Sequence, residues 1–372
     1  MGWTNKAVMK RRAGLGRWGE NMVGQIVSWP RRLSVLAAIA AAIFIAAESM
    51  TAQAQTSRGP VTLAIGSAAG GGYDQYARLT ARFLQRELPG NPTVVPKNMT
   101  GAGGIVVLNW TYNSAPRDGT VIASSQGSAI FAPLQGMAGS QYDPRQFNYL
   151  ISLGDLKNML IVWHTSPVKS LDDVFNKGME LGNVAGDSSI IPAMLNRLIG
   201  TKFKIIAGYP GTNAVSLAVE RGEVDGTINL EWGSIKAVRS NWLTEKKIRV
   251  LLQITFNPLS EMSDVPSIEK YIKTTEDRDM LQILLAKQDI GRPFMAPPGV
   301  AAEIVAEQRR ILEKISKDPE FLAEAEKQRL SIDPSPGTEL EALVNRIYAI
   351  PQSTIDALHR EMKLAESGSV ER

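Results

Sequence analysis

The sequence predicts an α/β fold with largely parallel sheets, and two features of the chain support this prediction. From Val61 onward, short apolar runs alternate with amphipathic stretches. This alternation is typical of strands joined by helices that cover the faces of a sheet. In addition, glycine clusters at 67–74 and 98–104 each follow a strand-like run and open a helix-like stretch. With 372 residues, the chain is long enough for two domains.

The elements can be placed from the same pattern. Strands are predicted at Val61–Ile65, Thr93–Pro96, Val121–Ser124, Phe147–Leu153, Met159–Trp163, Phe203–Ile206, Thr227–Leu230 and Val250–Ile254. Helical periodicity is found at 74–88, 105–113, 191–198, 214–218 and 301–316. Ser170 and Asp173 have the spacing of a capping box, which predicts that a helix begins after Ser170.

The N-terminal segment has the layout of an export signal. Residues 1–32 carry seven basic residues against one acidic residue, an apolar run spans Leu33–Ala47, and the A-x-A pattern ends at Ala54. The run is short for a membrane span, which needs about 20 apolar residues. We therefore predict a cleaved signal peptide over residues 1–54. Met9 and Met22 are alternative starts, and the pair Arg31-Arg32 leaves both Sec and twin-arginine export open.

Charge and cysteine content narrow the function classes. Residues 1–54 hold seven of the 41 Lys and Arg residues and two of the 37 Asp and Glu residues. The full chain has a formal charge of +4, whereas residues 55–372 have a formal charge of −1. That balance gives no support for nucleic-acid binding. The chain has no cysteine, which excludes disulfides, thiolate nucleophiles and a lipid-bearing cysteine. We expect an unanchored protein in the periplasm.

The first glycine cluster is a candidate anion site. A strand, a glycine turn and a helix start leave backbone N–H groups unpaired at one edge of a sheet. The candidate ligand-binding residues of this loop are Ser67, Ala68, Gly70, Gly71, Gly72, Tyr73 and Asp74. Gly71 and Gly72 are expected to adopt angles, or to allow an approach, that a Cβ would obstruct. Neither dinucleotide nor P-loop spacing is present. A tight turn without a ligand is the alternative.

Three other polar loops are candidates to complete a pocket. The residues concerned are Ser125, which follows a strand, Ser188 and Ser189 at a helix start, and Tyr209 and Thr212 at another helix start. Open α/β sheets bind ligands at such strand ends. The alternative is that each hydroxyl only caps a helix.

Catalytic chemistry finds little support in the sequence. His164 and His359 have no partners at catalytic or metal-binding spacing, and no Gly-x-Ser-x-Gly elbow occurs. Asp172 and Asp173 are better explained as helix-capping residues. We predict a binding protein that is not an enzyme and that uses no metal and no cofactor.

An ordered set of motifs resembles a known family. The motifs are Ala69–Asp74 with Ala77-Arg78, Asn98 with Gly101–Gly104, Pro116–Thr120, Tyr209 and Gly211 with Gly222–Asp225, Asp264–Pro266, and Ala296–Gly299. Together they are similar to the receptor subunits of tripartite tricarboxylate transporters, the TctC or Bug-type periplasmic solute-binding proteins. The chain departs from the family pattern in having Ala69 where the family has proline, and Gly72 at a variable position.

The resemblance implies a type II periplasmic-binding-protein fold of two lobes around a ligand cleft. The implied boundaries are 55–158 and 288–372 for the first lobe and 159–287 for the second. Crossings are expected near Leu156–Trp163 and Leu285–Gly291. The implied ligand is a small carboxylate, held by the loops at 67–74, 186–189 and 209–213, with Tyr73 at the pocket mouth.

The resemblance also implies a monomeric receptor that delivers its ligand to membrane permease subunits. A periplasmic subunit that signals to a membrane kinase is one alternative, and a secreted α/β enzyme is another. The sequence does not identify the ligand.

Overall fold

The structure, a computed structural model, describes residues 59–184 and 189–366. The predicted signal peptide lies outside the described residues, as does Ser188. These described residues belong to one compact unit. Across the described ranges, no helix combines the length and the apolar character that a membrane crossing requires.

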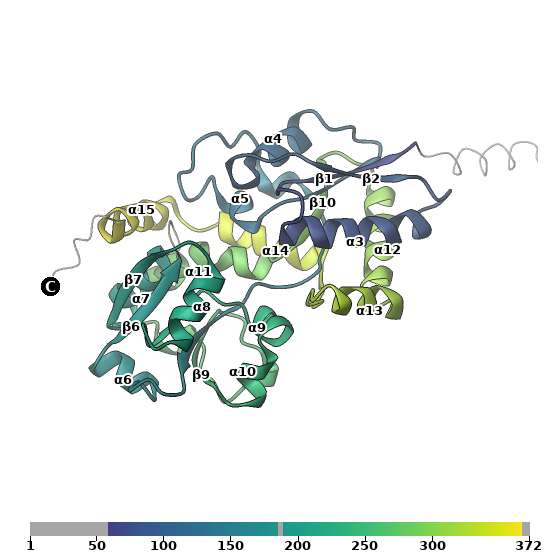
Figure 1. Cartoon of the computed structure of the whole chain (residues 1–372). Helices are drawn as coiled ribbons and strands as arrows, with labels where there is room; N and C mark the ends of the chain where they lie inside the picture. The colour runs from purple at the N-terminus through teal and green to yellow at the C-terminus, as the bar shows by residue number, and fades with distance from the viewer. Residues whose placement is uncertain (1–58, 185–188, 367–372) are drawn as a thin grey trace, which may run out of the picture. The chain divides into compact units, whose positions relative to one another are not determined.

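The first lobe is built on a six-stranded sheet in the order β11-β4-β10-β3-β1-β2 (Figure 1). Its strands are β1 (Val61–Ile65), β2 (Val94–Asn98), β3 (Val121–Ser124), β4 (Asn148–Ser152), β10 (Pro293–Ala296) and β11 (Ser335–Pro336). β1 pairs in parallel with β2 and β3. β10 joins antiparallel to β3 and β4, and β11 joins antiparallel to β4.

Helices pack on both faces of this sheet because its strands alternate their side chains between two cores. Leu63 and Ile65 of β1 lie in one cluster with α3 and α12, whereas Ala64 lies in another with α4 and α5. The helical segments of this lobe are α3 (Gly72–Glu87), η1 (Ala102–Gly104), α4 (Ile105–Asn113), α5 (Gly127–Phe131), η2 (Pro144–Gln146), α12 (Ala302–Ile315), α13 (Pro319–Lys327) and α14 (Gly337–Tyr348). The last helix, α15 (Gln352–Glu366), packs on α7 and α11.

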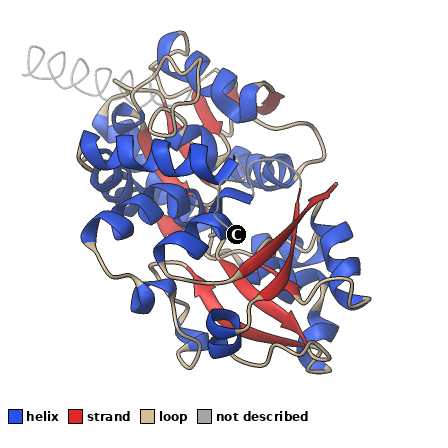
Figure 2. Cartoon of the chain, turned by 90° about the vertical axis from the view of Figure 1, so that its left-hand side faces the viewer, coloured by secondary structure: helices blue, strands red, loops and turns tan. Residues whose placement is uncertain are grey.

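The second lobe is built on a five-stranded sheet in the order β7-β6-β8-β5-β9. Figure 2 shows the strands of the two sheets as separate groups flanked by helices. The strands are β5 (Asn158–Trp163), β6 (Met179–Val184), β7 (Phe203–Tyr209), β8 (Gly226–Thr227) and β9 (Ile248–Ile254), and the helical segments are α6 (Leu171–Asn176), α7 (Ile190–Leu198), α8 (Thr212–Glu220), α9 (Trp232–Val238), α10 (Ser240–Thr244), η4 (Ser260–Met262) and η5 (Ile268–Tyr271). β6 is parallel to β7 and β8, and β5 is antiparallel to β8 and β9.

The chain passes between the sheets in two segments that run side by side. The Leu153 N–H donates to the Arg292 carbonyl at 3.2 Å, and the Arg292 N–H donates to the Gly154 carbonyl at 3.0 Å. The Leu156 N–H donates to the Gln288 carbonyl at 3.0 Å. The crossings therefore lie at about 153–158 and 288–292, overlapping the predicted ranges.

Helix α11 (Thr275–Ile290) joins the cores of the two lobes. It packs against α5 and α14 of the first lobe and against α7 of the second. Its buried side chains belong to one apolar cluster that contains residues of both sheets. Because α11 contacts both lobes, the boundaries at 158/159 and 287/288 stay predictions.

The two-lobed α/β fold is confirmed, but the sheets are mixed and not mostly parallel. The antiparallel pairs are β10 with β3 and β4, β11 with β4, and β5 with β8 and β9; of these strands, β4, β5 and β10 adjoin the crossings. A strand that returns from the other lobe enters its sheet from the opposite direction. Of the strands, β6, β10 and β11 were not predicted. The predicted capping box is present, with Ser170 and Asp173 bonded reciprocally.

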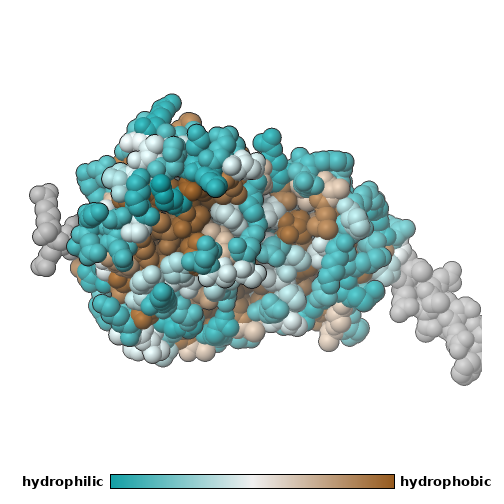
Figure 3. Space-filling view, turned by 90° about the horizontal axis from the view of Figure 1, so that it is seen from below, coloured by the Kyte–Doolittle hydropathy of each residue, from teal (hydrophilic) through white to brown (hydrophobic). Residues whose placement is uncertain are grey.

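Hydrophilic side chains cover most of the face seen in Figure 3, and apolar side chains show between them in two areas. Large apolar residues that are more than a third exposed are few and scattered along the chain, such as Leu217 on α8, Val238 on α9 and Leu322 on α13. Single exposed apolar residues of this kind are normal on a folded protein.

Candidate functional site

Three loops of the first lobe meet at one sheet edge because β1, β2 and β3 end in register. Ile65 pairs with both Asn98 and Ser124. The predicted residues Ser67 and Ser125 therefore lie in neighbouring loops. The Asn98 Nδ2 donates to the Ser67 carbonyl at 2.9 Å and to Asp74 Oδ1 at 2.8 Å, which joins the second strand end to the first glycine loop.

Asp74 stabilises the first loop from inside. Its carboxylate accepts from the Gly70 N–H at 2.8 Å and from Arg78 Nε at 2.8 Å, in addition to Asn98. The side chain is 2% exposed. Burial opposes its ionisation, but the hydrogen bonds from Arg78, Gly70 and Asn98 together lower the pKa of Asp74 below its usual value. Both carboxylate oxygens are thus engaged within the protein.

The glycine of the first loop that needs its backbone freedom is Gly70, with φ +80°. Gly71 has ordinary extended angles, φ −72° and ψ 164°, and Gly72 begins α3 without a positive φ. The expectation of special angles at Gly71 and Gly72 is therefore wrong. It failed because the turn places its left-handed residue one position earlier. A Cβ at Gly72 would make only an ordinary contact, 3.9 Å from Arg292 Nη1, whereas a Cβ at Gly71 would lie a tight 3.2 Å from the Ala68 carbonyl oxygen.

The start of α3 is a free donor site. No side chain caps the helix, because the one acidic residue of its first turn, Asp74, turns back to Gly70. Within the described residues, the Gly72 and Tyr73 N–H groups have no hydrogen-bond partner. The buried Ser67 hydroxyl, in the same loop, also has none. Buried polar atoms without partners are rare in folded proteins, which indicates a position that a ligand or water fills.

Ser125 has a structural contact. It is fully buried, and its hydroxyl donates to the Gly104 carbonyl at 3.2 Å. A Cβ at Gly104 would lie 2.3 Å from this hydroxyl, so glycine is required for the contact. Ser125 thereby holds the second glycine loop against the β3–α5 connection.

The candidate residues of the second lobe also lie at neighbouring strand ends, since Val184 of β6 pairs with Tyr209 of β7. Ser189 precedes α7 but makes no capping bond, and its hydroxyl accepts from Asn183 Nδ2 at 2.8 Å. Thr212 is exposed in the first turn of α8, where Gly211 is the N-cap. Helix capping therefore does not explain either hydroxyl.

Arg292 is a candidate site residue that the sequence reasoning missed. It lies in the crossing that leads into β10, and its side chain is 14% exposed. Its Nη2 donates to Glu231 Oε2 of the second lobe at 3.3 Å. Its guanidinium carbon lies 4.5 Å from the Tyr76 ring centroid and 5.5 Å from that of Tyr73. A planar cation between two aromatic rings is well oriented to receive a carboxylate.

Tyr73 is anchored at the crossing. Its hydroxyl donates to the Gly291 carbonyl at 3.1 Å and accepts from the Gly127 N–H at 3.4 Å. Burial raises the pKa of Tyr73 above its usual value, although Arg292 opposes the shift. The tyrosine therefore stays neutral and links the start of α3 to the hinge.

The guanidinium of Arg292 keeps its positive charge although the side chain is largely buried. Burial would lower the pKa of Arg292, but its interactions with Tyr76 and Glu231 outweigh burial and raise it. Burial also raises the pKa of Glu231, against the effect of Arg292. The charge of Arg292 is thus balanced by one carboxylate whose ionised form is itself disfavoured.

The sequence did contain one signal for Arg292. It stands between Gly291 and the apolar run of β10, where a charged residue is unexpected. Its partners Tyr76 and Glu231 are far away in sequence, so only the folded chain reveals the cluster. No group of His, Asp and Glu in the described part of the chain has the arrangement of a metal site.

Comparison with family models and with curated proteins gives no match. Solved structures do resemble this one. A TctC solute-binding protein from Polaromonas is 19% identical, with a TM-score of 0.63 over 80% of this chain and 98% of that one. R. palustris Rpa4515 with adipate is 19% identical, with a TM-score of 0.52 over 83% and 97%. A structure described as a periplasmic transporter is 18% identical, with a TM-score of 0.51 over 82% and 96%. The chain therefore has the two-lobed α/β fold of TctC-type solute-binding proteins.

Proposed function

We propose that this protein is a periplasmic solute-binding receptor of the TctC or Bug type that captures a small carboxylate. The binding centre is the uncapped start of α3 together with Arg292. The Gly72 and Tyr73 N–H groups supply donors, and Arg292 supplies the charge beside Gly72. Each hydrogen bond to a carboxylate contributes about 1.5–3 kcal/mol. Several such bonds, after the costs of association, give a dissociation constant near micromolar.

The observation that carries the proposal is the pairing of Arg292 with Glu231, which brings residues of both lobes to the start of α3. An incoming carboxylate competes with Glu231 for the guanidinium. The Ser67 hydroxyl and the loops with Ser189, Tyr209 and Thr212 line the remaining approach in this proposal. The fold likeness to a protein with bound adipate supports a carboxylate ligand.

The transport role extends the same proposal. Delivery to membrane permease subunits of a tripartite tricarboxylate-type transporter requires export, which the signal-like residues 1–54 would provide. The receptor binds as a monomer, without a cofactor and without catalysis. N-terminal sequencing of the periplasmic protein tests the export step, and the expected first residue is Gln55.

Binding is tested by calorimetry of the mature protein with acetate, adipate, citrate and benzoate. We expect at least one to bind near micromolar and Arg292→Gln to weaken that binding roughly ten- to hundredfold, the value of a charged hydrogen bond. Glu231→Gln should strengthen binding, because it removes the competing carboxylate.

Arg310→Gln is the matched control, because Arg310 is exposed on α12. Melting curves of each variant separate lost binding from lost folding, and the double variant at Arg292 and Glu231 leaves no unpaired buried charge. Absence of binding to the whole panel, or full binding by Arg292→Gln, contradicts the proposal.

A further inference from the structure

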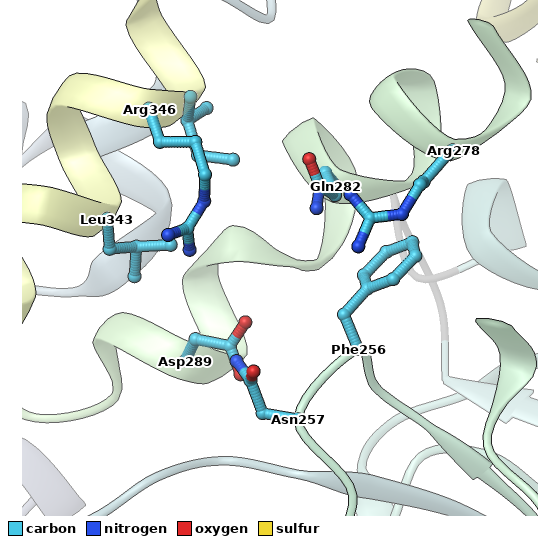
Figure 4. Close-up of a pocket in the computed structure, with 8 residues that line it drawn as sticks. Phe256, Asn257, Arg278, Gln282, Asp289, Leu343 and Arg346 are labelled. Carbon is cyan, nitrogen blue, oxygen red and sulfur yellow. The ribbon is translucent and has the colours of Figure 1, made fainter. Parts of the chain in front are cut away.

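A cavity lies beside the crossing segments. It consists of two adjoining pockets of about 230 and 470 Å³ that share Asn257, Asp289, Leu343 and Arg346. Figure 4 shows Arg346 and Arg278 on opposite walls, with Asp289 and Asn257 at the base. The combined space is in the range of sites for small molecules.

Residues of both lobes build this cavity, which we call the hinge pocket. Asn257 follows β9 of the second lobe, and Arg346 lies on α14, which packs on β4 of the first lobe. Asp289 is in the last turn of α11, immediately before the crossing. A ligand here would contact the elements that hold the two lobes together.

Two opposite charges of the hinge pocket, Asp289 and Arg346, form no close ion pair among the described residues. Lys157 pairs with Asp155 at 2.6 Å, and Arg278 pairs with Glu269 at 2.8 Å. By contrast, Asp289 Oδ1 is fully buried and accepts no hydrogen bond in the described residues. Arg346 is exposed and forms neither a hydrogen bond nor an ion pair with any described side chain.

The environment of Asp289 is costly for a carboxylate. Burial raises its pKa, against a hydrogen bond from Asn257 and the positive charges of Lys157 and Arg346. An orphaned buried acceptor of this kind is stabilised by a cationic donor. The arginine, in turn, is suited to a carboxylate. Leu343 and Ile347 provide an apolar wall between these polar groups.

We propose that the hinge pocket binds a small zwitterion, with an ammonium group on Asp289 and a carboxylate on Arg346, and with an apolar side chain against Leu343 and Ile347. An α-amino acid has this chemistry. The occupant would differ in class from the carboxylate of the main cleft, because it needs both charges. The inference does not rest on the proposed transport function.

The test uses L-leucine as the probe, with two analogues that each lack one charge. 4-Methylpentanoate lacks the ammonium group, and 3-methylbutylamine lacks the carboxylate. By calorimetry on the mature protein, we expect L-leucine to bind and each analogue to bind at least about tenfold more weakly. Asp289→Asn and Arg346→Gln should each weaken L-leucine binding by a similar factor.

Controls separate the hinge pocket from the main cleft. Arg310→Gln should bind L-leucine normally, and Asp289→Asn should keep its affinity for the carboxylate that the main cleft binds. L-leucine binding that is lost in Arg292→Gln but normal in Asp289→Asn would place it in the cleft and overturn the inference. No L-leucine binding would overturn it too, while the carboxylate panel still decides the proposed function independently.

Discussion

Arg292 illustrates how a structural role and a proposed binding role can fall on one residue. Its backbone N–H pairs with the Gly154 carbonyl in the crossing, and its side chain is held between Tyr73 and Tyr76. Little rotamer freedom is left to lose when a ligand binds, which favours affinity. The same position makes the guanidinium sensitive to movement of the hinge.

Asp74 is expected to make stability depend on pH. Its pKa is lower in the folded chain than in the unfolded chain. The stabilisation is therefore fully present above the unfolded value of about 3.9, and it is lost as the pH falls through the folded value. At pH 7, Asp74→Asn should lower the free energy of unfolding by about 1.5–3 kcal/mol, the value of hydrogen bonds to a charged group.

Denaturant titrations of the wild-type protein and of Asp74→Asn between pH 7 and pH 2 measure this effect. The difference in the free energy of unfolding between the two proteins should narrow only at acid pH. Asp264→Asn, at an exposed position, is the control and should match the wild type. A difference in the free energy of unfolding that does not change with pH would mean that the charge of Asp74 does not contribute to stability.

At the scale of elements, the paired crossing segments determine how the lobes are joined. Gly291 caps α11 with φ +59°, and its position allows the Tyr73 hydroxyl to reach its carbonyl. A Cβ at Gly291 would lie 1.9 Å from the Gly154 carbonyl oxygen. The atoms that an added Cβ would meet belong to the backbone, so no side chain can rotate to make room for it.

Gly291→Ala should therefore destabilise the protein far more than a left-handed angle alone explains. Gly222 is the matched comparison, because it has φ +71° and no atom within 4 Å of an added Cβ. We expect Gly222→Ala to cost about 1–2 kcal/mol and Gly291→Ala about 4 kcal/mol or more, measured by chemical unfolding. Equal losses of stability in the two variants would show that the two crossing segments can move apart at Gly291 without a cost in free energy.

At the scale of the whole molecule, the proposed function requires the lobes to move. A ligand that contacts both lobes stabilises a closed form through contacts absent from the open form. Trp163 was expected near a crossing, but it lies at the far end of β5 and packs on Trp242 at 5.3 Å between ring centroids. Trp232, next to Glu231, is the better reporter, with its Nε1 bonded to Glu261 at 2.7 Å.

Small-angle scattering of the mature protein should show a smaller radius of gyration when a bound carboxylate saturates it. Trp232 fluorescence should change in parallel, and Trp232→Phe should remove that change. The Arg292→Gln variant at the same ligand concentration is the control and should remain unchanged. Scattering that does not change at saturation would indicate a rigid binding module.

Local patterns in the sequence were enough for most elements. β1, β3 and β5 are mostly apolar and buried, and α3 and α12 have a clear apolar stripe. β6 was missed because Met179–Val184 contains Glu180, Gly182 and Asn183, which interrupt the apolar signal. β10 is four residues long and begins with proline, so tertiary pairing defines it as a strand.

The sequence by itself determined the α/β class and the glycine loops at the edge of the first sheet, because strand, turn and helix signals act over a few residues. Tertiary structure decided which loop residues are free to bind. It turned Asp74 inward, gave Ser125 a structural contact and brought Arg292 beside Gly72 and Glu231. These contacts join residues up to 220 positions apart, and no local pattern records a pairing that depends on the path of the chain between two lobes.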